Sequence, residues 1–309
     1  MPLIAGLRAA CCTAALSGVR LGAWAAFVSG PRGGPIALRA GEAAEVRAEI
    51  AARRAPPLFA HAAYTTSLGG AADGAADGAA GRHASLGEQL AAVAECGGDG
   101  LVVHLPKDSP AGAAARVAAA LHAAGVTDAP GPRVYLETPA FVPARLTAQG
   151  ADHPPWAAPA IGVATFADPS GLAELWRELA AAGAPMTRLG LCVDTAHVWT
   201  GGVCLRWRAP AAAYCAALDG VVAAIADGPT PRVLLHLNDS ARARGTGPDH
   251  HAPLGRGQIW GGAADGTARP DGLAEVVGWA AAHGFPAILE RNDDRDALAG
   301  DYAVLAQIK

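Results

Sequence analysis

The chain has 309 residues, of which 51% are hydrophobic and 17% are charged, and its formal net charge is −4. This length suits a single α/β barrel as well as two ordinary domains, and the hydrophobic content is sufficient for a large core. The negative balance excludes a generally basic nucleic-acid binder, although it permits a local binding site for nucleic acid.

The N-terminal residues 1–41 allow two interpretations. They contain no acidic residue and are rich in alanine and arginine, a composition that resembles an organelle transit peptide. We favour the alternative, in which residues 3–5 and 21–28 form the first two strands of the fold, because a barrel without them could not close. Arg8 and Arg20 interrupt the apolar stretch, so no membrane span is expected there.

The rest of the chain alternates short apolar strands with alanine-rich helices. Strands are predicted at residues 58–61, 100–104, 134–137, 189–194, 233–236 and 286–290. Helices are predicted at residues 8–16, 38–54, 85–96, 111–124, 170–182, 211–226, 272–283 and 295–308. A glycine- and alanine-rich repeat at residues 69–81 is interpreted as a flexible insertion without chemistry. This alternation predicts an α/β protein, a single (β/α)8 TIM barrel that spans residues 1–309 as one domain.

Side chains that can bind metal ions lie at the ends of six predicted strands. These residues are His61, His104, Glu137, Asp194, His236 and Glu290. Three further candidates, His197, Asp249 and His251, follow in loops. Because the carboxyl ends of the strands share one face of a barrel, we expect a metal site at that face. Imidazole and carboxylate ligands without thiolate favour Zn²⁺, with Mn²⁺ or iron possible at some positions.

Three segments of the sequence resemble the signatures of the endonuclease IV family of apurinic/apyrimidinic endonucleases (AP endonuclease family 2). They read Cys-Val-Asp-Thr-Ala-His at 192–197, His-Leu-Asn-Asp-Ser at 236–240, and Asp-His-His-Ala-Pro-Leu-Gly-Arg-Gly at 249–257. The matches follow the family's order from about residue 28 to 290, so the resemblance covers nearly the whole chain. It implies a xylose-isomerase-like barrel.

The resemblance also implies three zinc ions. The first would be held by His61, His104 and Glu137; the second by Glu137, Asp194, His236 and Glu290; the third by His197, Asp249 and His251. In this interpretation Glu137 bridges two ions, and Glu137 and Glu290 are the catalytic carboxylates. Metals placed in this way activate a water molecule, neutralise a phosphate and stabilise the leaving oxygen.

The implied reaction is hydrolysis of the phosphodiester 5′ to an abasic site in duplex DNA during base excision repair. It leaves a 3′-hydroxyl and a 5′-deoxyribose phosphate. The expected partner is therefore duplex DNA that contains abasic sites, with no membrane partner. The protein is expected to be a monomer inside the cell, wherever DNA is repaired, in the cytoplasm or the nucleus; targeting to an organelle is the alternative given by the N-terminal composition.

Candidate DNA contacts follow from the same resemblance. Arg32 and Tyr64 match family positions that insert into the duplex. Independently of the resemblance, three basic residues lie close in sequence to the third-metal loop and are expected to contact phosphates: Arg242, Arg244 and Arg256. The sequence departs from the family at Thr65, where an apolar residue usually follows the tyrosine, and at His250, which replaces an arginine. These departures concern DNA contacts and leave every ligand position filled.

Two other classes of function remain open from the sequence. A sugar isomerase or epimerase of the related barrels would share Glu137, Asp194, His236 and Glu290 but would need only one metal site. The additional histidines and Asp249 would have no use in such an enzyme. The other alternative is a catalytically silent DNA-binding relative, against which the complete set of ligands speaks.

Structural roles are expected for several neighbouring residues. Asn238 and Asp239, beside His236, are expected to orient the loop rather than to bind metal. Trp199 and Trp260 suit either stacking on a sugar or base, or packing at the barrel rim. The six cysteines contain no CxxC pair, which predicts reduced thiols in an intracellular protein.

Overall fold

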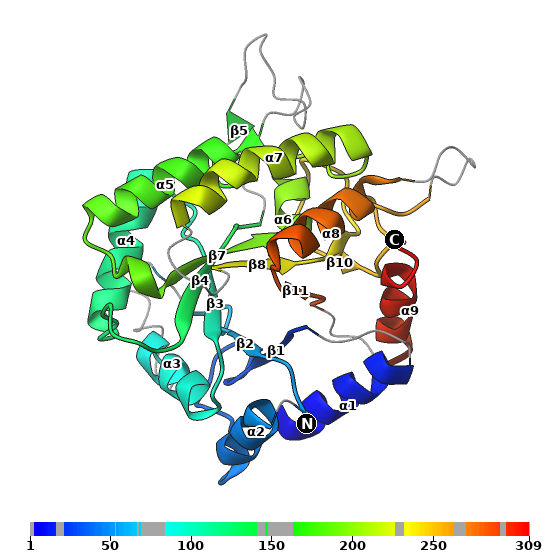
Figure 1. Ribbon diagram of the computed structural model, residues 1–309. Coiled ribbons are helices and arrows are strands. Elements are labelled where there is room, and N and C mark those ends of the chain that lie inside the picture. Colours follow the sequence, from blue (N-terminus) through cyan, green and yellow to red (C-terminus); the bar gives the residue numbers. More distant parts are fainter. Residues whose placement is uncertain are drawn as a thin grey trace. The chain divides into compact units, whose positions relative to one another are not determined.

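The computed structural model describes residues 3–16, 22–52, 54–66, 68, 84–140, 146–147, 163–225, 232–262, 270–290 and 295–308. Contacts divide the chain into two compact units. Unit 1 comprises Met1–Leu16, Arg20–Glu137 and Arg177–Leu191; unit 2 comprises Ser17–Val19, Thr138–Trp176 and Cys192–Lys309. Figure 1 shows the helices and strands in the colours of the sequence.

Unit 1 is built from parallel strands that alternate with helices (Figure 1). Its elements are α1 Leu3–Leu16, β1 Trp24–Phe27, α2 Glu42–Ala51, β2 Leu58–His61, α3 Leu86–Glu95, β3 Gly100–His104, α4 Pro110–Ala123, β4 Arg133–Glu137 and η3 Met186–Arg188. The strands pair in the order β1-β2-β3-β4, with Phe27 opposite His61 and His104 opposite Glu137. This register brings the ends of neighbouring strands to the same edge.

The strands of unit 1 are short apolar runs whose residues are mostly buried, as expected for parallel strands covered by helices. Helix α3 begins at a capping box, in which Ser85 and Glu88 satisfy each other's backbone amides. The helix is followed by Gly97, whose φ of 68° lies in the left-handed region. The capping box and Gly97 therefore mark the two ends of α3, and burial of its apolar residues stabilises the helix between them.

Unit 2 continues the pattern with parallel strands, helices and two small antiparallel ladders. Its elements are β5 Leu146–Thr147, β6 Val163–Ala164, α6 Thr195–Thr200, α7 Arg208–Ile225, β8 Val233–His236, β9 Asp239–Ser240, β10 His251–Ala252, α8 Gly272–His283, β11 Ala287–Ile288 and α9 Arg295–Leu305. Helix α5 Pro169–Ala181 and strand β7 Leu189–Asp194 contribute residues to both units. Strand β11 is parallel to β8, with Ile288 opposite His236.

The ladder of β9 and β10 is antiparallel and pairs His251 with Ser240. It folds the segment between residues 240 and 251 back on itself, so that His251 returns beside Ser240, in the short strand that follows β8. Helix α7 packs along α8 and buries Tyr214, Leu218 and Ile225. By length and composition alone α7 could cross a membrane, a property that core helices share.

The alternation of parallel strands and helices along the chain confirms the expected α/β barrel class. The expected first strand at residues 3–5 is wrong, because these residues begin the helix α1. The segment is rich in alanine and leucine, which favour helix, and Leu7 packs with Trp24, Val46 and Leu58 in the core of unit 1. The described residues therefore contain seven parallel strands where eight were expected. The insertion at 69–81 lies outside the described residues, and the single-domain assignment stays a prediction.

Candidate metal centre

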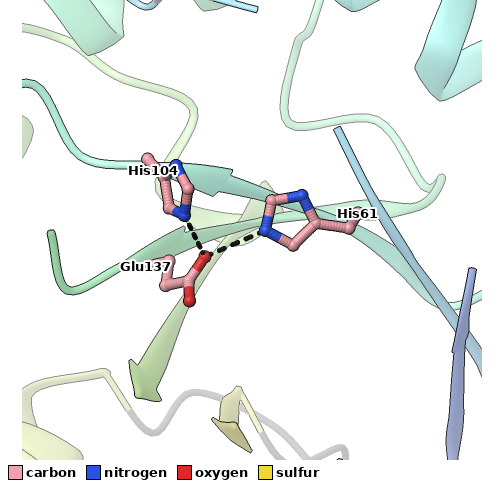
Figure 2. A group of neighbouring side chains, drawn as sticks. All are labelled: His61, His104 and Glu137. Atoms are coloured by element: carbon pink, nitrogen blue, oxygen red, sulfur yellow. Dashed lines mark hydrogen bonds and ion pairs between the residues drawn. The ribbon is translucent and has the colours of Figure 1, made fainter. Parts of the chain in front are cut away.

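The first group of ligands lies in unit 1, where three neighbouring strands end (Figure 2). The Nε2 atoms of His61 and His104 each lie 3.1 Å from Oε2 of Glu137. Glu137 is fully buried, and His61 is 3% exposed. One ligand atom from each residue lies within 4.8 Å of the others, so the group can hold a metal ion.

The tautomer of His61 is set by a hydrogen bond to the backbone of the next residue, Ala62. Its Nδ1 lies 2.6 Å from the carbonyl oxygen of Ala62, and a carbonyl can only accept a hydrogen bond. Nδ1 therefore carries a proton, and Nε2 faces Glu137. This is the usual arrangement of a metal-binding histidine, in which the second ring nitrogen is anchored by a hydrogen bond.

The aromatic ring of Tyr64 covers this first group. It is stacked on His104 with a 6° angle between the rings and 5.9 Å between their centroids, and it meets His61 and Phe27 edge to face. Even so, Tyr64 is 55% exposed. Tyr64 thus presents an exposed aromatic surface directly beside two candidate ligands.

The second group lies in unit 2 at the ends of β7, β8 and β11. Nδ1 of His236 is 3.0 Å from Oε2 of Glu290 and 3.9 Å from Oδ2 of Asp194. Asp194 and His236 are fully buried. The partner of both carboxylates is a histidine, whose neutral imidazole nitrogen is a common metal ligand. The group therefore offers two carboxylate oxygens and an imidazole nitrogen to a metal ion.

The third group adds residues from α6 and from the loop that ends in β10. Oδ2 of Asp249 lies 3.3 Å from Nε2 of His197 and 3.0 Å from Nε2 of His251. Nδ1 of His197 donates to the carbonyl oxygen of Thr138, which directs Nε2 toward Asp249. Oδ1 of Asp249 is buried and has no hydrogen-bond partner among the described residues. A buried carboxylate oxygen that lacks a donor fits a metal ion well.

The pKa values of this third group reflect its crowded carboxylates. Burial alone would lower the pKa of His251, but the hydrogen bond to Asp249 and the charges of Asp194, Asp249 and Glu290 raise it to about 9. Burial alone would raise the pKa of Asp249, but hydrogen bonds from His197 and His251 hold it well below its usual value. The metal-free group therefore keeps a cation, the imidazolium of His251, at neutral pH.

Asn238 connects the carboxylates of unit 2. Its Nδ2 donates to Oδ2 of Asp194 at 2.6 Å and to Oε2 of Glu290 at 3.1 Å, and its Oδ1 accepts from the backbone amide of Glu290. The backbone of Asn238 is held in turn by the Thr195 hydroxyl, which accepts from its amide and lies 2.7 Å from its carbonyl oxygen. These hydrogen bonds support the orienting role expected of Asn238, whereas the sequence alone did not indicate Thr195 or Thr138.

Asp239 has a different role, because its carboxylate accepts hydrogen bonds from several backbone amides. Its Oδ1 accepts hydrogen bonds from Ser240, Ile259 and Trp260, and its Oδ2 accepts from Gly255 and Gly257. A Cβ at position 257 would overlap Asp239 Oδ1, which explains the glycine. Asp239 thereby fixes the loop that follows His251, as expected from the sequence.

The expected DNA-contacting residues lie on the surfaces of the two units. In unit 1 Arg32 is exposed, like Tyr64. In unit 2 Arg242 and Arg256 are exposed, and the guanidinium of Arg244 lies 5.9 Å from the ring of Trp199. The indole nitrogens of Trp199 and Trp260 donate to the carbonyl oxygens of Arg242 and Leu205, and both side chains are buried. Packing is therefore the role of both tryptophans in this structure.

No protein-family model matches the chain. A probable AP endonuclease of African swine fever virus (isolate Tick/South Africa/Pretoriuskop Pr4/1996) is 36% identical over 107 residues, which are 35% of this chain and 35% of the viral protein. A probable endonuclease 4 of Halorhodospira halophila is 43% identical over 72 residues, 23% of each chain. The aligned parts thus span about a third or less of the length of these relatives.

Comparisons of fold cover much more of the chain. The crystal structure of endonuclease IV from Thermus thermophilus matches with a TM-score of 0.65 and 26% identity over 96% of this chain and 93% of that chain. The crystal structure of AsfvAP:AG matches with a TM-score of 0.73 over 96% and 89%, and at 22% identity it supports the fold alone. Local sequence similarity and the fold agree, and in both respects the chain is similar to endonuclease IV.

Proposed function

We propose that the protein is a metal-dependent endonuclease that hydrolyses the phosphodiester 5′ to abasic sites in duplex DNA, in base excision repair. The products are a 3′-hydroxyl and a 5′-deoxyribose phosphate. The observation that carries this proposal is the gathering of buried histidines and carboxylates at the strand ends of both units, in a fold shared with endonuclease IV. The similarity to proteins named AP endonuclease supports the substrate class.

Zn²⁺ is the metal that this donor set fits best, with Mn²⁺ or iron as substitutes at some positions. In unit 1 it would be held by His61, His104 and Glu137. In unit 2 two ions would be held by Asp194, His236 and Glu290, and by His197, Asp249 and His251. All donors are imidazole nitrogen or carboxylate oxygen, and the buried Asp249 oxygen without a donor supports a cation there. The bridging role of Glu137 stays a prediction.

Bound zinc would supply a nucleophile from water at neutral pH and neutralise charge on the phosphate. The other contributions come from the protein's own side chains. Asn238 holds the carboxylates of Asp194 and Glu290 at fixed positions. His251 would give up its proton on becoming a ligand, and the burial of Glu137 would strengthen its interactions with cations.

DNA contacts would come from exposed side chains of both units. Tyr64 and Arg32 in unit 1 would enter the duplex at the lesion, where the missing base reduces the cost of unstacking. Arg242, Arg244 and Arg256 in unit 2 would contact phosphates. Because the chain has a net charge of −4, we expect the metals to supply much of the attraction for the DNA backbone.

The sugar-isomerase alternative finds no support in the structure. A single metal site would leave two ligand groups unused: the pair His61 and His104 on Glu137, and His197 and His251 on Asp249. A monomer inside the cell, at the site of DNA repair, is the assembly and location that we propose with this function.

The test is cleavage of a labelled duplex that contains one tetrahydrofuran abasic analogue, with zinc content measured on the same sample. The analogue cannot undergo β-elimination, so a product that ends in a 3′-hydroxyl demonstrates hydrolysis 5′ to the lesion. An intact duplex of the same sequence is the control. Metal-loaded protein that leaves the abasic strand uncut would reject the proposal and favour the silent DNA-binding relative or a sugar substrate.

A further inference from the structure

A single buried amide, the side chain of Gln89, lies behind the exposed residues of unit 1. Gln89 is on helix α3 and is fully buried. Its Oε1 accepts from the backbone amide of Ala63 at 3.1 Å and from the hydroxyl of Ser29 at 3.4 Å. Its Nε2 donates to the hydroxyl of Thr66 at 2.8 Å and to the carbonyl oxygen of Ala84 at 3.1 Å. Both donors and both acceptor positions of the amide are therefore used.

Three of these partners, Ser29, Ala63 and Thr66, belong to two loops that follow adjacent strands. The Arg32 loop, residues 29–34, follows β1, and the Tyr64 loop, residues 62–66, follows β2. The loops also contact each other, because the amide of Tyr64 donates to the carbonyl oxygen of Pro31 at 2.9 Å. The amide of Ala84, just before α3, donates to the carbonyl oxygen of Gly34. The hydrogen bonds of the Gln89 side chain thus reach both loops and the segment that leads into its own helix.

We propose that Gln89 is a positioning residue that holds the Arg32 loop and the Tyr64 loop as one preformed recognition edge. The inference rests on the proposed function, in which the exposed guanidinium of Arg32 and the exposed ring of Tyr64 contact abasic DNA. Loops that are already ordered lose little entropy when DNA binds, so their order increases the affinity. Gln89 itself is fully buried and acts only through the loops that it holds.

The chemistry of this position demands an amide. Glutamate would keep the acceptors for Ala63 and Ser29, but it would set a carboxylate against the carbonyl oxygen of Ala84. Methionine has a similar length but would leave the Ala63 amide without its acceptor, and a buried polar group without a partner is costly. Both substitutions should loosen the loops, and methionine should loosen them more because it removes all four hydrogen bonds.

The experiment compares the wild-type protein with Gln89→Met and Gln89→Glu. Hydrogen exchange, which needs no DNA, is measured on peptides that cover the two loops, alongside zinc content and binding to abasic and intact duplexes. We expect exchange in both loops to become about 10-fold faster or more, and affinity for abasic duplex to fall by about 10-fold, with unchanged zinc content and near wild-type cleavage at saturating DNA. Affinity for intact duplex should change much less.

Leu90→Ala is the matched control, because it removes buried packing from the next residue of α3 and leaves the hydrogen bonds of Gln89 in place. It should lower thermal stability and leave the ratio of abasic to intact binding unchanged. Thr66→Val removes one partner of Gln89 while leaving α3 intact, so it provides the test if the Gln89 variants do not fold. It should accelerate exchange in the Tyr64 loop.

The outcomes separate this inference from the proposed function. Unchanged exchange in both loops of a folded Gln89→Met protein would overturn the positioning role, whatever happens with DNA. Faster exchange with unchanged affinity for abasic duplex would overturn the link to recognition. If the metal-loaded wild-type protein neither binds nor cleaves abasic duplex, the proposed function fails, whereas faster exchange in the variant would still support the coupling of the loops.

Discussion

The candidate ligand group of unit 1 and the group of His197, Asp249 and His251 in unit 2 bring the same kinds of donor atom together by different structural means. In unit 1 the ligands end three strands, and the parallel register alone places His104 opposite Glu137. In unit 2 His197 lies on a short helix, and Asp249 and His251 lie on a loop that returns beside β9. A strand end needs little support because the sheet fixes it, whereas a loop must be fixed by side chains.

Those supporting side chains are visible in unit 2. Asn238 holds two carboxylates, and Asp239 holds the backbone amides of the loop. On α9, Asp301 accepts from the amide of Leu254 in the same loop. The comparison teaches that metal binding in unit 1 should respond to changes in the ligands themselves, whereas binding in unit 2 should also respond to buried residues that never touch the metal.

The largest effect is expected from Glu137→Gln, which breaks the group of unit 1 directly. Glutamine keeps the shape but loses the charge on which His61 and His104 converge, so cleavage should fall by about 1,000-fold or more and at least one zinc should be lost. Cleavage kinetics and zinc content check both effects. The control is Glu95→Gln on the exposed end of α3. Wild-type cleavage in the Glu137 variant would remove this carboxylate from the catalytic machinery.

The second-largest effect is expected from Asp239→Ala, which removes the support of the ligand-carrying loop in unit 2. It deprives five backbone amides of their acceptor, so we expect the free energy of unfolding to fall by about 3 kcal/mol and zinc to be lost from unit 2 only. Chemical unfolding and zinc stoichiometry measure the two effects. Asp239→Asn keeps one acceptor oxygen and should cost less. A stable Asp239→Ala protein with full zinc content would show that the loop needs no such support.

The pH dependence of zinc binding should also distinguish the groups. Because the pKa of His251 is raised to about 9 in the metal-free protein, zinc must displace a proton there at neutral pH. Affinity at this site should therefore rise by up to about 10-fold per pH unit until the pH reaches about 9. In the metal-free protein the same shift stabilises the fold below pH 6.5, and that contribution is lost as the pH rises through about 9.

Chelator competition between pH 6 and pH 9, in about half-unit steps, measures this dependence. The His251→Asn variant, which cannot titrate in this range, serves as the control and should bind zinc weakly with a flatter profile. An affinity that does not change with pH in the wild-type protein would mean that His251 is already neutral before zinc binds.

The smallest effect is expected at Tyr64, because its ring packs on two candidate ligands of unit 1 but is not a ligand itself. Tyr64→Ala should weaken binding to abasic duplex by about 5- to 10-fold and leave zinc content nearly unchanged. Tyr64→Phe keeps the stack on His104 and should behave almost like the wild-type protein. Binding assays with abasic and intact duplexes test this prediction, and equal binding by the alanine variant would remove Tyr64 from DNA recognition.

The sequence predicted most strand ends well, because each apolar run stops at or near a candidate ligand. Glu290 is an instructive exception, since β11 ends at Ile288 and the carboxylate follows it. The helix α1 was mistaken in part for a strand, because a run as short as Leu-Ile-Ala carries no period that separates the two. The five amides on Asp239 could not be predicted, since they come from residues 1 to 21 positions away whose backbone conformation no local pattern specifies.

The close approach of Gly257 to Asp239 has a practical consequence for anyone who wishes to redesign this loop. The two positions form a locked pair, because a side chain at 257 can be accommodated only if the carboxylate at 239 is displaced. On either side of Gly257, the side chains of Arg256 and Gln258 are exposed. A randomised library should therefore keep positions 239 and 257 constant and vary position 258, and it should include position 256 only where loss of the proposed phosphate contact of Arg256 is acceptable.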